Sequence, residues 1–217
     1  MERTIVLSVL KALLFDLDGT LYMSTALGRE IRRSACRYVA DLRGIGIAEA
    51  DLLISEAKAR LTATSGIDTP MSLACIDLGG DLQELHRRFA EEIDPAPFLS
   101  RDARVAELLK ILGSSFDLYL YTNNNRTLSA AIMRLIGVTG LFKEVFTIED
   151  SWRPKPNREA LAEILRMVGR KPEECLFVGD RYDVDLRLPA EMGCAVFLVS
   201  SIEELLSLCK LMSEENV

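Results

Sequence analysis

Short runs of apolar residues, each followed by a polar or glycine-containing segment, recur along the chain. Four of them are clear and a fifth is weaker: residues 10–15, 118–121, 175–178, 195–199 and, more weakly, 145–148. Continuous apolar runs of this length are typical of strands that are buried on both faces, as in a parallel sheet. The pattern therefore predicts the strands of a parallel sheet at these positions.

Helical periodicity fills the segments between most of these runs. Apolar residues recur at spacings of three and four over 105–112, 128–136 and 161–168, and a glycine follows each stretch. A glycine at that place is a common end of a helix. Because strands and helices alternate from residue 102 onward, we predict an α/β fold with right-handed crossovers.

The segment 22–99 differs from the rest, because it shows helical patterns and no convincing strand. Its helices are predicted around residues 31–42, 52–61 and 82–93. A helical insert directly after the first strand would lie over the carboxyl ends of the strands, where open α/β sheets bind ligands. We therefore predict two domains, a core made of residues 1–21 and 100–217 and a helical domain made of residues 22–99.

Composition excludes several classes of protein. Asp and Glu number 33 against 26 Lys and Arg, and this net charge of −7 argues against a protein that binds a nucleic-acid polymer through its phosphates. No apolar run approaches the length of about 18 residues that a transmembrane helix needs, so we expect no membrane association and a cytoplasmic location. The five cysteines, odd in number and without a CxxC pair, are typical of reduced, buried thiols.

His86 is the single histidine, so the chain offers one imidazole for acid–base catalysis and no His-rich zinc site. It falls in the third predicted helix of the segment 22–99, where we favour a position on the helix surface over contact with a substrate. Arg126 follows the second strand of the core, and contact with a substrate or with solvent is equally compatible with its position. Carboxylates, hydroxyls, a lysine or a bound metal are therefore expected to perform the chemistry.

Four polar motifs follow strand-like runs and combine the residue types that phosphoryl chemistry requires. They are Asp16-Leu17-Asp18-Gly19-Thr20, Thr122-Asn123-Asn124-Asn125, Arg153-Pro154-Lys155-Pro156-Asn157 and Gly179-Asp180-Arg181-Tyr182-Asp183-Val184-Asp185. Taken singly, the second is also typical of a capped strand-to-helix turn, and the third of a solvated surface lysine. Taken together at one edge of a sheet, they supply carboxylates for a hard cation and a hydroxyl, amides and a lysine for an anion. This combination predicts a site for a phosphoryl group bridged by Mg²⁺.

The order of these motifs resembles that of the haloacid dehalogenase (HAD) superfamily of Mg²⁺-dependent phosphohydrolases. That order is DxDGT, a Ser or Thr, a Lys, and Gly-Asp followed by a further Asp, and the resemblance covers about residues 10–21 and 100–200. It implies a Rossmann-like three-layer core with a parallel sheet and an inserted all-helical cap domain, for which the segment 22–99 has the right size. Leu21-Tyr22, Tyr38 and the pair Thr122-Asn123 look more specifically like the branch that contains pyrimidine 5′-nucleotidases.

The resemblance also implies catalytic roles, carried over position by position. Asp16 would be the nucleophile that forms an aspartyl-phosphate, and Asp18 would be the general acid and then the general base. Thr122 and Asn123 would hold the phosphoryl oxygens. Lys155 would offset the charge that builds up between the phosphate and Asp16.

The metal site is implied in the same way. Mg²⁺ would be held by Asp16, the backbone carbonyl of Asp18, Asp180 and Asp185, with Asp183 as an alternative to Asp185. The implied enzyme is a Mg²⁺-dependent phosphomonoesterase for a small phosphorylated metabolite, with a nucleoside monophosphate as one candidate. Two alternatives remain, a phosphomutase of the same superfamily and a non-catalytic binding protein of the same fold.

Overall fold

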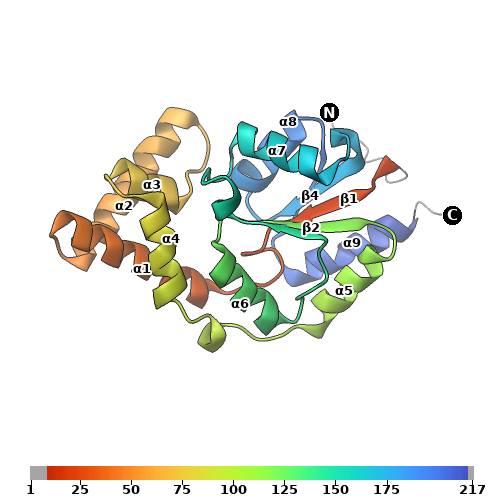
Figure 1. Cartoon of the computed structure of the whole chain (residues 1–217), viewed down its shortest axis with the longest axis horizontal. Coiled ribbons are helices and arrows are strands. Elements are labelled where there is room, and N and C mark those ends of the chain that lie inside the picture. Colours follow the sequence, from red (N-terminus) through yellow and green to blue (C-terminus); the bar gives the residue numbers. More distant parts are fainter. Residues whose placement is uncertain (1–8, 215–217) are drawn as a thin grey trace.

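A five-stranded parallel sheet forms the centre of the computed structural model, which describes residues 9–214 (Figure 1). The strands are β1 (Ala12–Phe15), β2 (Asp117–Tyr121), β3 (Glu144–Phe146), β4 (Cys175–Gly179) and β5 (Ala195–Leu198), arranged in the order β3-β2-β1-β4-β5. Each apolar run singled out in the sequence corresponds to one strand, and three of the strands extend one residue beyond their runs. The weakest run gives the shortest strand, because its last residue, Ile148, already begins a 3₁₀ turn.

Strand β1 lies in the middle of the sheet and pairs in parallel with β2 on one side and β4 on the other. In this register Leu14 lies opposite both Tyr119 and Phe177. Because the strands are parallel, the carboxyl ends of β1, β2 and β4 meet at one edge of the sheet. Whatever follows these three strands in the sequence is therefore brought together in space.

Helices cover both faces of the sheet and complete three layers. One face packs against α5 (Ala103–Gly113), α6 (Arg126–Ile136) and α9 (Ile202–Glu214), and the other against α7 (Arg158–Val168) and α8 (Arg187–Glu191). Along β1, Leu13 and Phe15 belong to the first apolar layer and Leu14 to the second. Burial on both faces explains why the strands show continuous apolar runs rather than alternation. The predicted α/β fold is confirmed.

Local sequence sets the ends of the helices that begin at the motifs. The side chains of Asn125 and Asn157 accept hydrogen bonds from backbone N–H groups in the first turns of α6 and α7. Gly137 and Gly169 end the same two helices in the left-handed conformation, with φ of 80° and 68°. Part of the polar character of the second and third motifs therefore serves helix capping.

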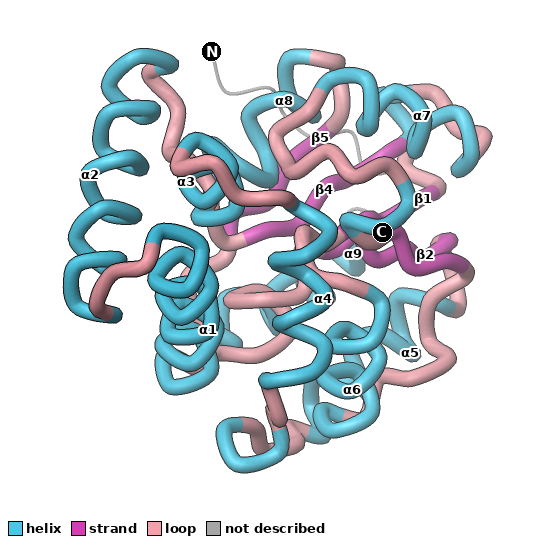
Figure 2. The backbone as a smooth tube through the Cα atoms, turned by 60° about the vertical axis from the view of Figure 1, so that its left-hand side comes forward, coloured by secondary structure: helices cyan, strands magenta, loops and turns pink. Residues whose placement is uncertain are grey.

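The helical segment lies beside the carboxyl edge of the sheet, where its helices pack on one another (Figures 1 and 2). It consists of α1 (Thr25–Arg43), α2 (Ile47–Ser65), α3 (Met71–Asp77) and α4 (Leu82–Glu92). Sequence periodicity missed α3, because its seven residues span only about two turns and show too little of the repeat. The segment is helical as expected, and the exact division into domains at residues 21 and 100 stays a prediction.

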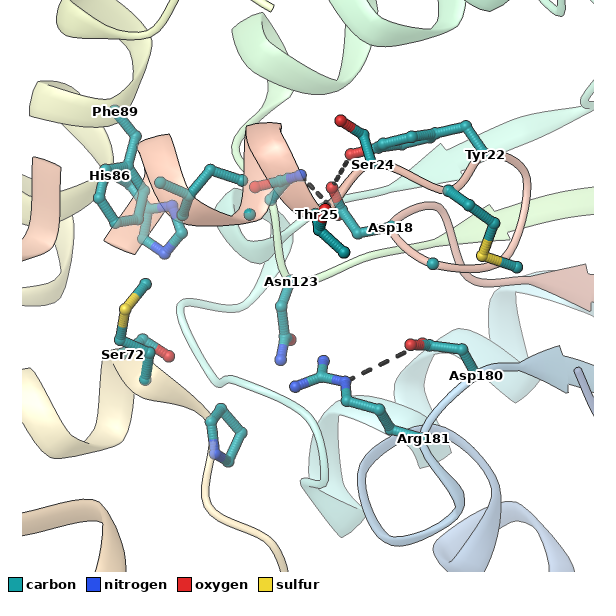
Figure 3. Close-up of a pocket in the computed structure, with 17 residues that line it drawn as sticks. Asp18, Tyr22, Ser24, Thr25, Ser72, His86, Phe89, Asn123, Asp180 and Arg181 are labelled. Carbon is teal, nitrogen blue, oxygen red and sulfur yellow. Dashed lines mark hydrogen bonds and ion pairs between the residues drawn. The ribbon is translucent and has the colours of Figure 1, made fainter. Parts of the chain in front are cut away.

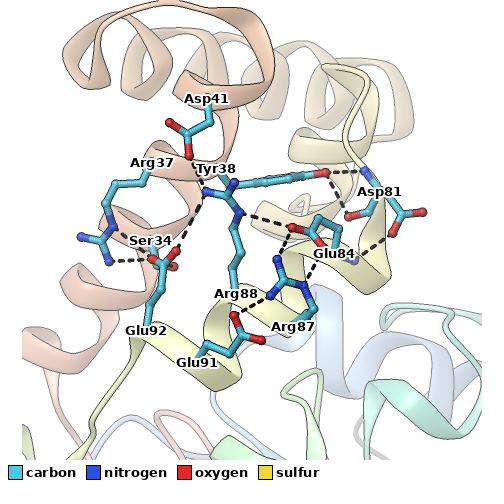
Figure 4. A network of polar contacts seen from close by, with 10 residues as sticks. All are labelled: Ser34, Arg37, Tyr38, Asp41, Asp81, Glu84, Arg87, Arg88, Glu91 and Glu92. Atoms are coloured by element: carbon cyan, nitrogen blue, oxygen red, sulfur yellow. Dashed lines mark hydrogen bonds and ion pairs between the residues drawn. The ribbon is translucent and has the colours of Figure 1, made fainter.

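Ion pairs attach α4 to α1 within this cap (Figure 4). Arg88 of α4 contacts Asp41 at 2.6 Å, and its guanidinium lies over the ring of Tyr38, 5.3 Å from the ring centre. Arg37 of α1 contacts Glu92 of α4 at 3.0 Å. Exposed pairs of this kind contribute at most about 1 kcal/mol each. Acting together, they fix where α4 lies on α1.

Within the described part of the chain, no helix is both long and apolar enough to cross a membrane. Four cysteines, Cys36, Cys75, Cys175 and Cys194, are buried free thiols, which agrees with their predicted role as small apolar residues. The cytoplasmic location stays a prediction.

Candidate active site

The polar motifs converge at the carboxyl edge of the sheet. Asp16 follows β1, Thr122 follows β2 and Asp180 follows β4, while Lys155 comes from the loop between β3 and α7. A cavity of about 590 Å³ opens between this edge and the cap, and Asp18 and Asp180 line its sheet side (Figure 3). The convergence that the sequence predicted follows from the parallel strand order.

Lys155 joins two buried carboxylates at the bottom of the site. Its Nζ donates hydrogen bonds to Asp16 Oδ1 and Asp185 Oδ1, both at 2.6 Å, and to the carbonyl oxygen of Tyr121 at 2.9 Å. The three donors of the ammonium group are thus all used, which fixes its position. Burial acts to lower the pKa of Lys155, but the two carboxylates outweigh it and raise the pKa, so the side chain stays protonated. A fixed positive charge therefore lies directly beside Asp16.

The side chain of Asn123 positions this lysine. Its Oδ1 accepts the backbone N–H of Lys155 at 2.7 Å, and its Nδ2 donates to the carbonyl oxygen of Lys155 at 3.3 Å. The lysine loop therefore uses one donor and the acceptor of this amide. No sequence signal points to this contact, because the two residues are 32 positions apart. The role of Asn123 in holding the phosphoryl oxygens, which the resemblance implied, stays a prediction.

Asp16, Asp180 and Asp185 form the part of the site that can hold a cation. One carboxylate oxygen from each lies within 4.8 Å of the others. Asp180 Oδ1 is buried without a hydrogen-bond partner in the described structure, a costly arrangement that a bound cation would relieve. Hard carboxylate oxygens at this spacing suit Mg²⁺. These residues therefore fit the metal that the sequence implied.

Asp183 lies outside this cluster. Its carboxylate pairs with Arg187 and accepts the backbone N–H of Asp68, in the cap, at 3.2 Å. Asp185 is instead oriented toward the site by the π-helical turn over Tyr182–Leu186, and its Oδ2 accepts the backbone N–H of Arg181 at 3.2 Å. Of the two candidates that the sequence left open, the structure brings Asp185 to the other carboxylates.

Asp18 lines the cavity and is held separately from the carboxylate cluster (Figure 3). Its carboxylate accepts hydrogen bonds from Asn124 Nδ2 at 2.6 Å and from the hydroxyl of Tyr22. Burial raises the pKa of the Asp18 carboxyl, while these hydrogen bonds act in the opposite direction. A raised pKa favours the protonated form that a general acid needs. Asn124 and Tyr22 are site residues that the sequence did not identify as partners of Asp18.

Thr122 is buried at the end of β2, as the motif order suggested. Its Oγ1 accepts the backbone N–H of Asn124 at 3.1 Å. Because this bond uses the hydroxyl as an acceptor, the hydroxyl can still donate its own hydrogen to a phosphoryl oxygen. The role of Thr122 in phosphate binding stays a prediction.

Gly19 is required by the close approach of two motif loops, which gives a first testable prediction. It has a φ of +78°, and a Cβ at this position would collide with the carboxylate of Asp180. We expect Gly19→Ala to weaken Mg²⁺ binding and to lower the hydrolytic rate by at least roughly tenfold, since it strains the turn and displaces Asp180. Calorimetric titration with Mg²⁺ measures the first effect, and Gly44→Ala, where a Cβ would meet open space, controls for backbone strain alone. Unchanged Mg²⁺ affinity would contradict this account of Gly19.

The sequence left open whether His86 and Arg126 contact a substrate, and the structure places the two side chains differently. His86 is buried, with 4% of its surface exposed, and it lines the cavity, so the helix-surface position that we favoured is wrong. The reason is that the face of α4 that carries His86 packs toward the core and the cavity rather than toward solvent. Arg126 is largely exposed and pairs with Asp150 at 2.7 Å, which leaves it a solvent-facing role.

At the edge of the parallel sheet, a buried lysine lies between two carboxylates, beside a carboxylate cluster that suits a hard cation. Phosphoryl chemistry uses residues of these types in such an arrangement. Residues 10–193 match the family model of the haloacid dehalogenase-like hydrolases. The chain therefore belongs to the haloacid dehalogenase-like hydrolase family.

Two curated relatives extend over most of the chain. A glyceraldehyde 3-phosphate phosphatase from Methanopyrus kandleri is 27% identical over 209 residues, covering 82% of this chain and 79% of the relative. The pyrophosphatase PpaX from Bacillus pumilus is 26% identical over 176 residues, covering 81% and 76%. The predicted enzyme class, a hydrolase of the phosphatase type, is confirmed, while the nucleotidase branch stays a prediction.

Among solved structures, the HAD-hydrolase YfnB from Bacillus subtilis bound to magnesium shares the fold. It superposes with a TM-score of 0.55 and 20% sequence identity, covering 93% of this chain and 99% of that chain. The agreement supports the Rossmann-like core with its helical insert.

Proposed function

We propose that this chain is a Mg²⁺-dependent phosphomonoesterase that acts on a small phosphate ester, with Asp16 as the nucleophile. The observation that carries the proposal is the position of Asp16. Its carboxylate contacts the buried Lys155 at 2.6 Å and lies in one cluster with Asp180 and Asp185. A carboxylate that is fixed beside a cation, at the point where a phosphoryl group would meet the sheet edge, suits in-line attack on phosphorus.

The surrounding residues have complementary roles in this proposal. Asp16 attacks phosphorus, the bond to the leaving oxygen breaks, and Asp18 donates its proton to that oxygen. Asp18 then accepts a proton from the water that cleaves the aspartyl-phosphate. Lys155 stabilises the negative charge that builds up on the phosphoryl oxygens near Asp16. Bound Mg²⁺, held by Asp16, Asp180, Asp185 and the backbone carbonyl of Asp18, would supply further charge neutralisation.

The names of the relatives and the size of the cavity limit the range of candidate substrates. Relatives named for glyceraldehyde 3-phosphate and for pyrophosphate favour a small phosphorylated metabolite. A nucleoside monophosphate stays in the proposal as a second candidate, because 590 Å³ is room enough for it. No residue of the four motifs is missing, which argues against a purely binding role. Conversion of a sugar 1-phosphate to the 6-phosphate without phosphate release would instead identify a phosphomutase.

Removal of the metal gives the prediction that tests the proposal. We expect the purified protein to release phosphate from 4-nitrophenyl phosphate in Mg²⁺, and EDTA to lower the rate by at least roughly a hundredfold, because the metal contributes several kcal/mol of charge stabilisation. Added Mg²⁺ should restore the rate, while circular dichroism shows that the fold persists throughout. A rate that EDTA leaves unchanged would overturn the metal dependence.

A further inference from the structure

The cap side of the cavity has a different character from the sheet side. Its walls include Met23, Ile31, Met71 and Phe89, and among the described residues that line the cavity the one cationic side chain is that of Arg181. This is the region that a leaving group would occupy, since it lies beyond Asp18 as seen from the sheet (Figure 3). The wall therefore favours a leaving group with an apolar surface and few charges.

Ser24, Thr25 and Ser72 add hydroxyls to this wall. Among its described residues, His86 is the one whose buried side-chain polar atoms lack a hydrogen-bond partner. The side chain is 4% exposed, lines the cavity, and both of its ring nitrogens are buried without a hydrogen-bond partner in the described structure. Buried polar atoms without partners destabilise a fold by about 1–3 kcal/mol each, so their presence beside a cavity indicates that a ligand supplies the partner. Burial lowers the pKa of His86 to about 4, so at neutral pH the ring is uncharged and offers one donor and one acceptor.

The position of His86 is fixed from several directions. Asn125, the capping residue of α6, donates a hydrogen bond from Nδ2 to the backbone carbonyl of His86 at 3.0 Å. The imidazole packs edge-to-face on Phe89, with ring centres 5.3 Å apart, and lies 6.3 Å from the ring of Trp152. Contacts from both the core and the cap therefore fix the position of the imidazole. A side chain fixed in this way is pre-organised for binding.

Arg181 lies on the sheet side of the cavity, beside two carboxylates of the cation cluster. Its Nε lies 4.0 Å from Asp180 Oδ1 and 4.0 Å from Asp185 Oδ2. A second anionic group that extends toward the cap would meet apolar side chains, hydroxyls and a neutral imidazole, and no cationic side chain among the described residues of the cap wall. Burial of a charge without a counter-ion is strongly unfavourable.

We propose that His86 is a specificity-determining residue that binds a hydroxyl or carbonyl oxygen of the leaving group. The substrates would then be phosphate monoesters of uncharged, oxygen-bearing molecules, either short polyols and hydroxyaldehydes or nucleosides. Esters with a second anion, such as phosphorylated carboxylic acids, would be selected against. This inference rests on the proposed phosphatase function and adds the class of leaving group.

A pair of matched esters tests the inference on the unmodified protein. Glycerol 3-phosphate and propyl phosphate have the same three-carbon chain, but propyl phosphate lacks the hydroxyls. We expect kcat/KM to be higher for glycerol 3-phosphate by roughly tenfold to a hundredfold, because propyl phosphate leaves His86 without a partner. We also expect 3-phosphoglycerate, which adds a carboxylate, to be a poorer substrate than glycerol 3-phosphate. The kcat/KM for uridine 5′-monophosphate, compared with that for glycerol 3-phosphate, shows whether a nucleoside or a polyol is the preferred leaving group.

Variants of His86 then test whether this side chain causes the preference for glycerol 3-phosphate over propyl phosphate. His86→Leu is expected to bring the ratio of the two kcat/KM values close to one, chiefly through a higher KM for glycerol 3-phosphate. His86→Gln, which keeps a donor and an acceptor, is expected to restore part of the ratio. Gln83→Ala, at an exposed position one turn earlier on α4, should leave the ratio as in the wild type. The fluorescence of Trp152, the single tryptophan, reports whether each variant is folded at the junction of cap and core.

Three results would overturn the inference alone: equal kcat/KM for the two esters, an unchanged ratio in folded His86→Leu, or a preference for 3-phosphoglycerate. If His86→Leu does not fold, the wild-type ratio still decides, because a ratio near one contradicts the inference. Hydrolysis of no ester at all, 4-nitrophenyl phosphate included, would overturn the proposed function and the inference with it.

Discussion

Asp16→Asn is expected to lower kcat for phosphate-ester hydrolysis by a factor of roughly 10⁴ or more, because an amide cannot act as the nucleophile. The fold should persist, since an amide oxygen can still accept the hydrogen bond that Lys155 Nζ now donates to Asp16 Oδ1. The measurement is phosphate release under saturating substrate and Mg²⁺, with circular dichroism as the test of folding.

A matched control separates the chemistry from the loss of a negative charge. Glu107 is an exposed carboxylate on α5, with 65% of its side chain accessible, and lies outside the site. Glu107→Gln makes the same change from carboxylate to amide and should keep the wild-type rate within about twofold. Wild-type activity in Asp16→Asn would show that another group attacks phosphorus.

Lys155→Met is expected to reduce both stability and activity. The substitution keeps much of the apolar stem but leaves the Asp16 and Asp185 carboxylates buried without the ammonium that now contacts both at 2.6 Å. Loss of one partner from a buried ion pair destabilises by about 3–5 kcal/mol, and loss of a charge that faces the transition state costs roughly a hundredfold to a thousandfold in rate. Denaturant unfolding in EDTA measures the free energy of unfolding, and the same experiment in Mg²⁺ should recover part of the loss, because the cation relieves the repulsion between the carboxylates.

Lys143→Met is the control for this prediction. Lys143 is 61% exposed and pairs with Asp117 at the surface, so its removal should change the free energy of unfolding by less than about 1 kcal/mol. A free energy of unfolding for Lys155→Met equal to that of the wild type would show that the buried lysine is not needed to hold the carboxylates.

Much of the fold could be predicted from the sequence because its strands are buried on both faces. A run such as residues 175–178 contains no polar position, so its apolar pattern is clear, and it corresponds to β4 within one residue. The parallel order then explains why motifs more than a hundred residues apart meet at one edge. The short helix α3 could not be predicted, since seven residues do not establish a period.

The site could be predicted only as far as the backbone determines it. Asp16, Asp180 and Asp185 are brought together by strand order and by the turn that follows β4. The contact of Asn124 with Asp18 joins residues 106 positions apart, and it depends on which way the side chains point from two loops. The burial of His86 depends in the same way on how the cap packs on the core. Sequence patterns describe the face of a helix, but not which neighbour covers that face.

The central claim, that Asp16 carries the phosphoryl group, can be tested by trapping the acyl phosphate. The wild-type protein is mixed with a substrate ester and Mg²⁺, quenched in acid, and treated with borohydride, which reduces an acyl phosphate to an alcohol. Peptide mapping by mass spectrometry should then find homoserine in place of aspartate at position 16, and only when substrate and Mg²⁺ are both present. A reduced residue at any other position, or phosphate release with no reduced residue, would contradict the assignment of Asp16 as the nucleophile.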